Sequence, residues 1–148
     1  LKGASKVFAI DINKDAVANT KENSKLNKVS NKITILEGDL YTPLPKNIKF
    51  DTIFWNIPFG YIEKEDISIL EKAVFDPNYK STKRFIFEAK DYLKNKGHLL
   101  IGFSTSLGKF EILKKFLKEA GFKIKLLAEI KSVETHPVKF ELFEAIPI

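Results

Sequence analysis

The chain has 148 residues, of which 44% are hydrophobic and 12% aromatic, a composition that suits one globular core and argues against intrinsic disorder. Because it has no cysteine and no apolar run longer than residues 99–103, the sequence excludes disulfides, thiolate metal sites and a membrane-spanning helix, and it favours a cytoplasmic location. The net charge of +6 comes from 24 lysines and a single arginine, so attraction of nucleic acid and plain solubility explain it equally well.

The first third of the chain predicts strands that alternate with a helix. An unbroken apolar run predicts a strand at residues 6–12, and a second strand is predicted at residues 33–36. Between them, Asn13 can cap a helix that continues to about Asn27. Residues 50–55 then predict a third strand, which we expect to be buried.

The rest of the chain continues the alternation and then changes character. Apolar residues recur at helical spacing in three stretches, 67–74, 85–92 and 110–120, of which the second is expected to stop at residues 95–97. Residues 98–104 predict a strand. Apolar and charged residues alternate at 122–126 and 138–142, which predicts an antiparallel hairpin with His136 and Pro137 in its loop.

These elements predict an α/β fold. Apolar strands that alternate with helices are typical of a parallel sheet packed against helices, and the final hairpin adds antiparallel strands at the end. No repeat, linker or low-complexity segment interrupts the sequence. We therefore expect one domain, residues 1–148, with a Rossmann-like sandwich and a mostly parallel sheet.

Polar residues follow the predicted strands where a ligand is expected in such a fold. The first strand ends in Asp11 and Ile12, and the second is followed by Asp39 and Leu40. A carboxylate at the first strand end can accept hydrogen bonds from the hydroxyls of a ribose. A second carboxylate, at the neighbouring strand end, can reach an adenine amino group, with Ile12 and Leu40 against the ring. Each aspartate alone equally suits a loop carboxylate, but their recurrence at consecutive strand ends favours a nucleoside site.

The third strand leads into Asn56-Ile57-Pro58-Phe59, and here the sequence resembles a known family. From residue 6 to residue 146 it is similar to the class I S-adenosylmethionine-dependent methyltransferases, within them to the "small domain" group with an Asn-Pro-Pro-Tyr/Phe signature. Members of that group methylate planar amino groups of glutamine amides or of nucleic-acid bases. The resemblance implies S-adenosyl-L-methionine as cofactor, and as partner either nucleic acid, with RNA favoured over DNA, or a protein substrate.

The resemblance also assigns roles in the signature. Asn56 and a backbone carbonyl of the motif would accept hydrogen bonds from the amino group and turn its lone pair toward the methyl group. Phe59 would stack on the flat acceptor, and Pro58 would hold Ile57 extended so that its carbonyl faces the site. Catalytic roles are thus expected for Asn56, Pro58 and Phe59, and donor contacts for Asn56 together with the residues at the first two strand ends.

Two departures from the family pattern stand out. Ile57 replaces the first proline of the signature, which keeps the carbonyl and loses only a rigid backbone angle. The glycine-rich loop that binds the donor's amino-acid portion in the family has no counterpart here. Residues 1–4 resemble the end of the helix that follows this loop, and the chain contains no methionine. We therefore expect a domain that is incomplete at its N-terminus, with a central strand and a glycine-rich turn upstream.

Alternatives remain open at this point. A methyltransferase-like module without activity would tolerate the absent glycine loop, whereas a nicotinamide dehydrogenase would have no use for the Asn56 motif. His98 and His136 have no partner spacing for a metal site, and Trp55 is expected in the core. Residues 61–83 are the only stretch that we expect to contact the acceptor.

Overall fold

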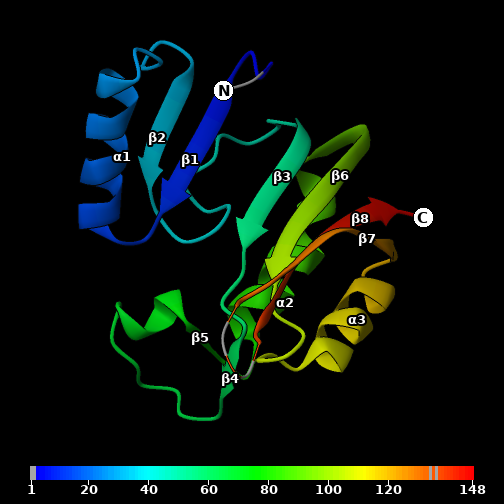
Figure 1. Cartoon of the computed structure of the whole chain (residues 1–148). Coiled ribbons are helices and arrows are strands. Elements are labelled where there is room, and N and C mark those ends of the chain that lie inside the picture. The colour runs from blue at the N-terminus through cyan, green and yellow to red at the C-terminus, as the bar shows by residue number, and fades with distance from the viewer. Residues whose placement is uncertain (1–2, 134, 136) are drawn as a thin grey trace. The chain divides into compact units, whose positions relative to one another are not determined.

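The first part of the chain forms a small parallel sheet with one helix beside it (Figure 1). The computed structural model of the protein describes residues 3–133, 135 and 137–148, which form two compact units, Leu1–Lys46 and Asn47–Ile148. In the first unit, β1 (Val7–Asp11) pairs in parallel with β2 (Ile33–Glu37).

The helix of the first unit is α1 (Lys14–Leu26), and its start follows from the sequence. The Asn13 side chain accepts a hydrogen bond from the Asp15 amide at 2.9 Å, which satisfies one of the free N–H groups in the first turn. Val17 is buried against the strands. The two strands and the helix confirm the elements predicted for this part of the chain.

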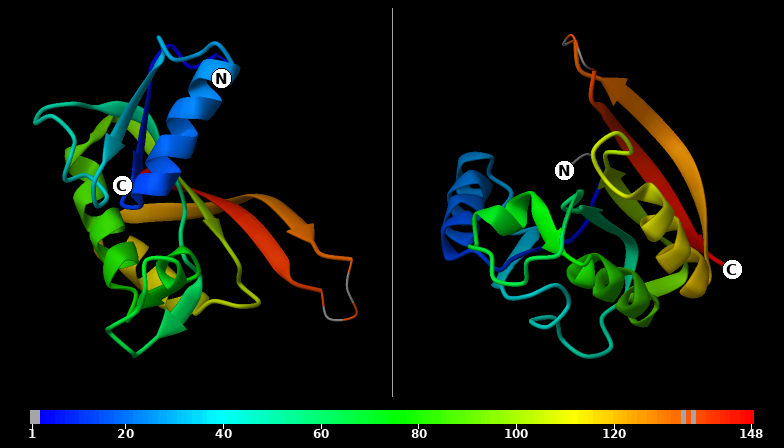
Figure 2. Two further views of the ribbon diagram at one scale, coloured as in Figure 1. Left: turned by 90° about the vertical axis from the view of Figure 1, so that its left-hand side faces the viewer. Right: turned by 90° about the horizontal axis from the view of Figure 1, so that it is seen from below.

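The second unit contains a four-stranded sheet in the order β3-β6-β8-β7. The first two of these, β3 (Phe50–Asn56) and β6 (Leu93–Phe103), are parallel. The last strand, β8 (Lys139–Pro147), is antiparallel to both β6 and β7 (Phe122–Lys131). β7 and β8 form the predicted antiparallel hairpin, and Figure 2 shows it extending well beyond the helices of its unit.

Helices α2 (Lys80–Glu88) and α3 (Phe110–Glu119) pack against the same face of this sheet. Trp55 of β3 contacts the Phe85 ring of α2 at 5.0 Å between ring centroids, and Phe143 of β8 stacks on Phe110 of α3 at 4.9 Å. Because β3, β6 and β8 are in register, Trp55 and Phe143 lie on one row across the sheet. The side chains on this row and on the facing helices form the core of the unit.

The stretch 67–74 does not form the helix that its spacing predicts. It contains only the short 3₁₀ helix η1 (Glu71–Ala73), and the chain then pairs β5 (Phe75–Pro77) with β4 (Gly60–Ile62). Only Ile67 of the apolar positions is buried, whereas Leu70 is 74% exposed. The Gly60 amide donates to the Val74 carbonyl at 2.9 Å, so a long-range strand pairing overrides the local helical pattern.

Two further expectations are corrected by the sheet. In the part of the chain that the structure describes, only the β3 face that carries Trp55 meets helices. Phe54, on the opposite face, is 61% exposed, so β3 is not the buried strand that we expected. The second helical stretch ends before residues 95–97. α2 is followed by the 3₁₀ helix η2 (Ala89–Asp91), and β6 begins at Leu93 with a bulge opposite the start of β3.

Candidate functional site

The carboxyl end of β1 carries the first predicted aspartate. Asp11 is exposed, and its Oδ1 accepts a hydrogen bond from the Asn13 amide at 2.8 Å. This bond holds the carboxylate in place at the turn into α1. The first unit therefore presents an oriented carboxylate where the sequence predicts the ribose contact.

The second predicted aspartate lies on the neighbouring turn. The Gly38 amide donates to the Asp11 carbonyl at 3.0 Å, which ties the end of β2 to the end of β1. After it, the Asp39 carbonyl accepts hydrogen bonds from the Thr42 hydroxyl at 2.7 Å and the Thr42 amide at 3.0 Å. Leu40, between them, has the left-handed φ of 51° that non-glycine residues rarely adopt. These two turns thus lie side by side, as the strand order predicts.

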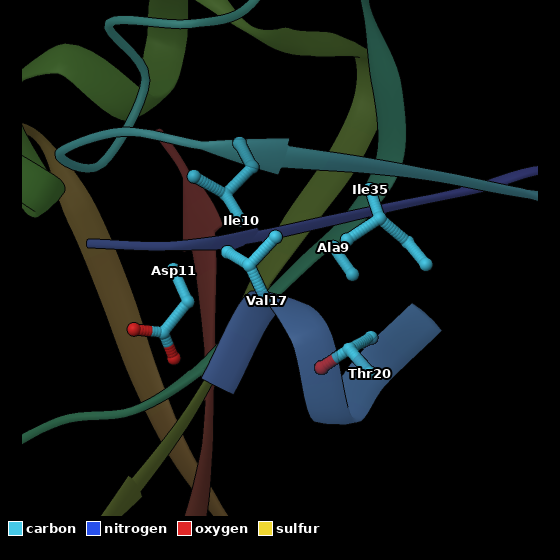
Figure 3. Close-up of a pocket in the computed structure, with 6 residues that line it drawn as sticks. All are labelled: Ala9, Ile10, Asp11, Val17, Thr20 and Ile35. Carbon is cyan, nitrogen blue, oxygen red and sulfur yellow. The ribbon is translucent and has the colours of Figure 1, made fainter. Parts of the chain in front are cut away.

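An apolar side chain accompanies the two carboxylates. Ile12 is 44% exposed at the end of β1, where it can cover one face of a flat ring. A pocket of about 50 Å³ lies deeper, between the strands and α1, and is lined by Ala9, Ile10, Asp11, Val17, Thr20 and Ile35 (Figure 3). Ligand pockets of several hundred Å³ are usual, so this one is a gap in the packing and not a nucleoside site.

The second unit places Asn56 at the carboxyl end of β3, directly opposite Gly102 of β6. Asn56 is exposed. A Cβ atom added at Gly102 would lie only 3.2 Å from the Asn56 Cγ and closer still to its Oδ1. Glycine at 102 therefore leaves the space that the Asn56 amide occupies against β6, a complementarity that the sequence alone does not reveal.

The backbone segment after Asn56, which joins β3 to β4, is held at both ends. The Ile57 amide donates to the Gly102 carbonyl at 3.2 Å, and both Ile57 and Pro58 are buried. The Phe59 carbonyl accepts a hydrogen bond from the Tyr79 hydroxyl at 2.6 Å. The predicted motif is therefore a fixed segment with one exposed side-chain amide at its start.

The ring of Phe59 is half-buried and lies edge-on to Phe140 of β8, with 6.2 Å between the ring centroids. Its contact with the hairpin fixes one side of the ring. Stacking of Phe59 on an acceptor stays a prediction.

A buried carboxylate fixes the loop that follows β6. Glu141 of β8 is 6% exposed and accepts hydrogen bonds from the Thr105 amide at 2.9 Å and from the Thr105 hydroxyl. The Ser106 hydroxyl accepts from the Lys139 amide at 2.9 Å. The loop beyond the strand that faces Asn56 is thus tied to β8, and sequence reasoning missed this anchor.

The stretch predicted to contact the acceptor, residues 61–83, carries a polar chain at its surface. The Tyr61 hydroxyl donates to Asn78 Oδ1 at 3.1 Å, and Asn78 Nδ2 donates to Glu65 at 2.8 Å. The Lys80 ammonium forms an ion pair with Glu65 at 2.6 Å. Its hydrogen bond to the Glu65 carboxylate holds the pKa of that carboxyl below its usual value. The stretch is ordered by its own side chains.

The remaining sequence candidates have structural roles. His98 Nε2 lies 3.2 Å from the Thr52 hydroxyl across the β3–β6 pair, and Trp55 packs on Phe85 as expected for the core. Among the residues that the structure describes, no three histidine, cysteine or acidic side chains could hold a metal ion. The prediction for His136 lies outside the described residues. No helix in the described ranges is both long and apolar enough to cross a membrane.

Comparison with known proteins identifies relatives. A family model described as the methyltransferase small domain matches residues 2–125. A provisionally assigned protein N5-glutamine methyltransferase of Methanocaldococcus jannaschii is 38% identical over 134 residues, which cover 88% of this chain and 66% of that protein. The release factor glutamine methyltransferase of Aquifex aeolicus is 32% identical over 133 residues, covering 83% and 46% respectively. The chain thus spans less than two thirds of the length of these curated relatives.

Solved structures agree on the fold. A methyltransferase from Pyrococcus furiosus superimposes with a TM-score of 0.65 at 17% sequence identity, covering 97% of this chain and 64% of the other. At this identity the likeness concerns the fold alone. It confirms the predicted α/β Rossmann-like architecture with its antiparallel strands. The prediction of a further strand upstream of β1 stays a prediction.

Proposed function

The chain belongs to the methyltransferase small domain family, and from this premise we propose that it acts as an N-methyltransferase on the side-chain amide of a protein glutamine. A methyltransferase and S-adenosyl-L-methionine as its methyl donor, both predicted from the sequence, are confirmed at the level of the family. The glutamine acceptor is supported by the two relatives, both of which are glutamine methyltransferases by name.

One observation carries the proposal. Asn56 stands exposed at the end of β3, opposite a glycine that leaves room for its amide, and it opens a segment whose last carbonyl is held by Tyr79. An exposed amide on a fixed segment suits recognition of a planar amino group. Within the described residues, no other polar side chain of the Asn56–Phe59 motif is available for this role.

The chemistry explains why such a group is needed. The donor supplies an already activated methyl group, whereas the lone pair of an amide nitrogen is delocalised into its π system. Oδ1 of Asn56 and the Ile57 carbonyl accept the two N–H groups of the substrate amide. This orients the nitrogen for in-line attack and stabilises the positive charge that develops on it. Phe59 provides a flat apolar surface for the amide.

The first unit supplies residues that fit the donor. Asp11 accepts the ribose hydroxyls, and Asp39 lies one turn away for the adenine amino group. Ile12, exposed at the same edge, and Leu40 supply apolar faces for the adenine ring. The fit rests on the hydrogen bond between the two turns and on an exposed aliphatic side chain beside a carboxylate, the combination that a nucleoside requires.

A nucleic-acid base is the second candidate acceptor, with RNA favoured over DNA. The net charge of +6 favours it, because a basic surface attracts phosphates. The exocyclic amino group of a base has the same delocalised lone pair as an amide. The same residues of the Asn56 motif would therefore serve either substrate.

Methyl transfer to two probes separates the candidates. The protein is incubated with S-adenosyl-L-methionine labelled in its methyl group and with either purified release factor of Aquifex aeolicus or total RNA. Label on a glutamine side chain of the release factor supports the proposal, and label in RNA alone replaces it with the second candidate. Calorimetry with S-adenosyl-L-methionine tests the inactive-module alternative, which predicts that the protein does not bind the donor.

A further inference from the structure

We infer that Tyr79 is a positioning residue for methyl transfer, which sets the direction of the motif backbone through the Phe59 carbonyl. The inference rests on the proposed function. Tyr79 is twenty residues beyond the motif in sequence, yet its hydroxyl lies 2.6 Å from the Phe59 carbonyl oxygen. Tyr79 lies in the same unit as the motif, so its effect on transfer is expected through the Phe59 carbonyl.

The hydrogen bonds around the Tyr79 hydroxyl fix its direction. The amide of Lys109, at the start of α3, donates to the hydroxyl oxygen at 2.9 Å. Because that oxygen already accepts from Lys109, its own hydrogen is free to point at Phe59. Burial raises the pKa of Tyr79 above its ordinary value, so the hydroxyl stays a donor across the neutral range.

The placement of Tyr79 is enforced by an unfavourable backbone. Asn78 and Tyr79 have φ of 52° and 51°, and side chains rarely adopt two consecutive left-handed conformations. The surrounding structure compensates, because the Asn78 amide donates to the Ile62 carbonyl at 2.8 Å and the Tyr79 amide donates to the Asp76 carbonyl at 3.1 Å. Strain of this kind gathers at sites that need one fixed geometry.

The ring of Tyr79 is as constrained as its backbone. Its residue is 0% exposed, and Tyr61 and Phe103 meet it edge-on at 5.3 and 6.5 Å between ring centroids. A hydroxyl on a ring that cannot move is a fixed point for the Phe59 carbonyl. Only three residues lead from Asn56 to this point, so fixing the end of the segment limits the directions that the Ile57 carbonyl can take.

A purely structural role would give a different pattern of effects. In that case Tyr79 would serve to tie α3 to the rest of the unit, and loss of the bond from Lys109 would matter as much as loss of the bond to Phe59. Loss of the tie to α3 would then be visible at the Ile112 and Leu113 amides, which donate to the Lys109 carbonyl at 3.0 and 3.4 Å at the start of α3. Tyr79→Phe removes both bonds and keeps the ring.

The test compares Tyr79→Phe with Tyr92→Phe, the same change at a half-buried tyrosine outside the motif. Two quantities are measured: amide hydrogen exchange, at Ile57 and Gly60 beside the motif and at Ile112 and Leu113 of α3, and methyl transfer to the Aquifex aeolicus release factor. We expect Tyr79→Phe to raise exchange at Ile57 and Gly60 several-fold more than at Ile112 and Leu113. We expect it to lower kcat by about 10-fold or more while the KM for the acceptor and the Kd for the donor change less than about 2-fold, since misplacement of a reacting group by 1 Å can cost about 100-fold.

Tyr92→Phe should leave these exchange rates and kcat near the wild-type values. An equal rise of exchange at the α3 amides and at the amides beside the motif in Tyr79→Phe would overturn the inference in favour of a structural role. Unchanged exchange at Ile57 and Gly60 in Tyr79→Phe would overturn it as well, and this measurement needs no substrate. A wild-type protein that transfers no methyl group contradicts the proposed function instead, and the exchange rates then still decide whether Tyr79 positions the motif.

Discussion

Replacement of Gly102 by alanine perturbs the Asn56 amide with a single added methyl group. The new Cβ would lie 3.2 Å from the Asn56 Cγ and 3.3 Å from its Cα, and nearer still to Oδ1. Gly102 has no left-handed φ, so alanine causes no backbone strain there. The Asn56 side chain therefore has to rotate away, whereas the 3.3 Å contact with its Cα requires only a shift of a few tenths of an ångström between the two strands.

The expected size of the effect follows from this displacement. Loss of one oriented polar group in a transition state lowers kcat by about 10² to 10³-fold. We expect Gly102→Ala to lower kcat by about 100-fold, at the lower end of this range, because a displaced Asn56 amide can still accept a hydrogen bond from part of the bound acceptor. Stability should change by less than about 1 kcal/mol, since the gain of about 0.5–1 kcal/mol from replacing glycine within a strand offsets the cost of the contact.

The assay is the initial rate of methyl transfer at saturating donor and acceptor, with thermal unfolding as the check on folding. Asn56→Ala combined with Gly102→Ala is the control. If Gly102→Ala acts through the Asn56 side chain, it causes no further loss once that side chain is absent. A full rate in Gly102→Ala, or an equal further loss in the Asn56→Ala background, would refute the reasoning.

Three other changes test the remaining assignments. Asp11→Ala should weaken binding of S-adenosyl-L-methionine by about 2–3 kcal/mol, measured by calorimetry, because it removes hydrogen bonds to a charged group; unchanged affinity in the variant would remove Asp11 from the donor site. Phe59→Ala should raise the KM for the acceptor more than it lowers kcat in steady-state kinetics, and the reverse order would argue against stacking. Burial raises the pKa of Tyr79 above its ordinary value of 10.0, so the native state holds this proton more tightly than the unfolded chain does. This tighter proton binding stabilises the native state fully below pH 10, and the stabilisation is lost as the pH rises through the native pKa. The free energy of unfolding measured in urea should therefore fall more steeply above pH 10 for the wild type than for Tyr79→Phe, and parallel curves would contradict this.

Local signals in the sequence were enough to predict most elements. An unbroken apolar run predicts β1, Asn13 at the start of α1 predicts its cap, and strict alternation predicts the hairpin of β7 and β8. Each of these depends on neighbouring residues only. The strand ends followed directly, which is why the positions of Asp11 and Asn56 at carboxyl ends were predicted correctly.

Long-range contacts were beyond the sequence. Residues 67–74 have helical spacing, but pairing of β5 with β4 holds the next residues extended. Gly102 lies forty-six residues from Asn56, and nothing near either residue indicates that they face each other. The role of Tyr79 depends on two left-handed residues that follow Pro77, a conformation that asparagine tolerates and that tyrosine adopts only under constraint.

The central claim, that the Asn56 amide orients the acceptor nitrogen for methyl transfer, is tested most directly by single-turnover kinetics of Asn56→Ala. The measurement is the rate of transfer from S-adenosyl-L-methionine to the release factor at saturating donor, with the donor Kd measured on the same preparation. The account predicts a donor Kd close to that of the wild type and a rate lower by about 100-fold or more. A wild-type rate in Asn56→Ala would show that Asn56 is only a turn residue and would contradict the account.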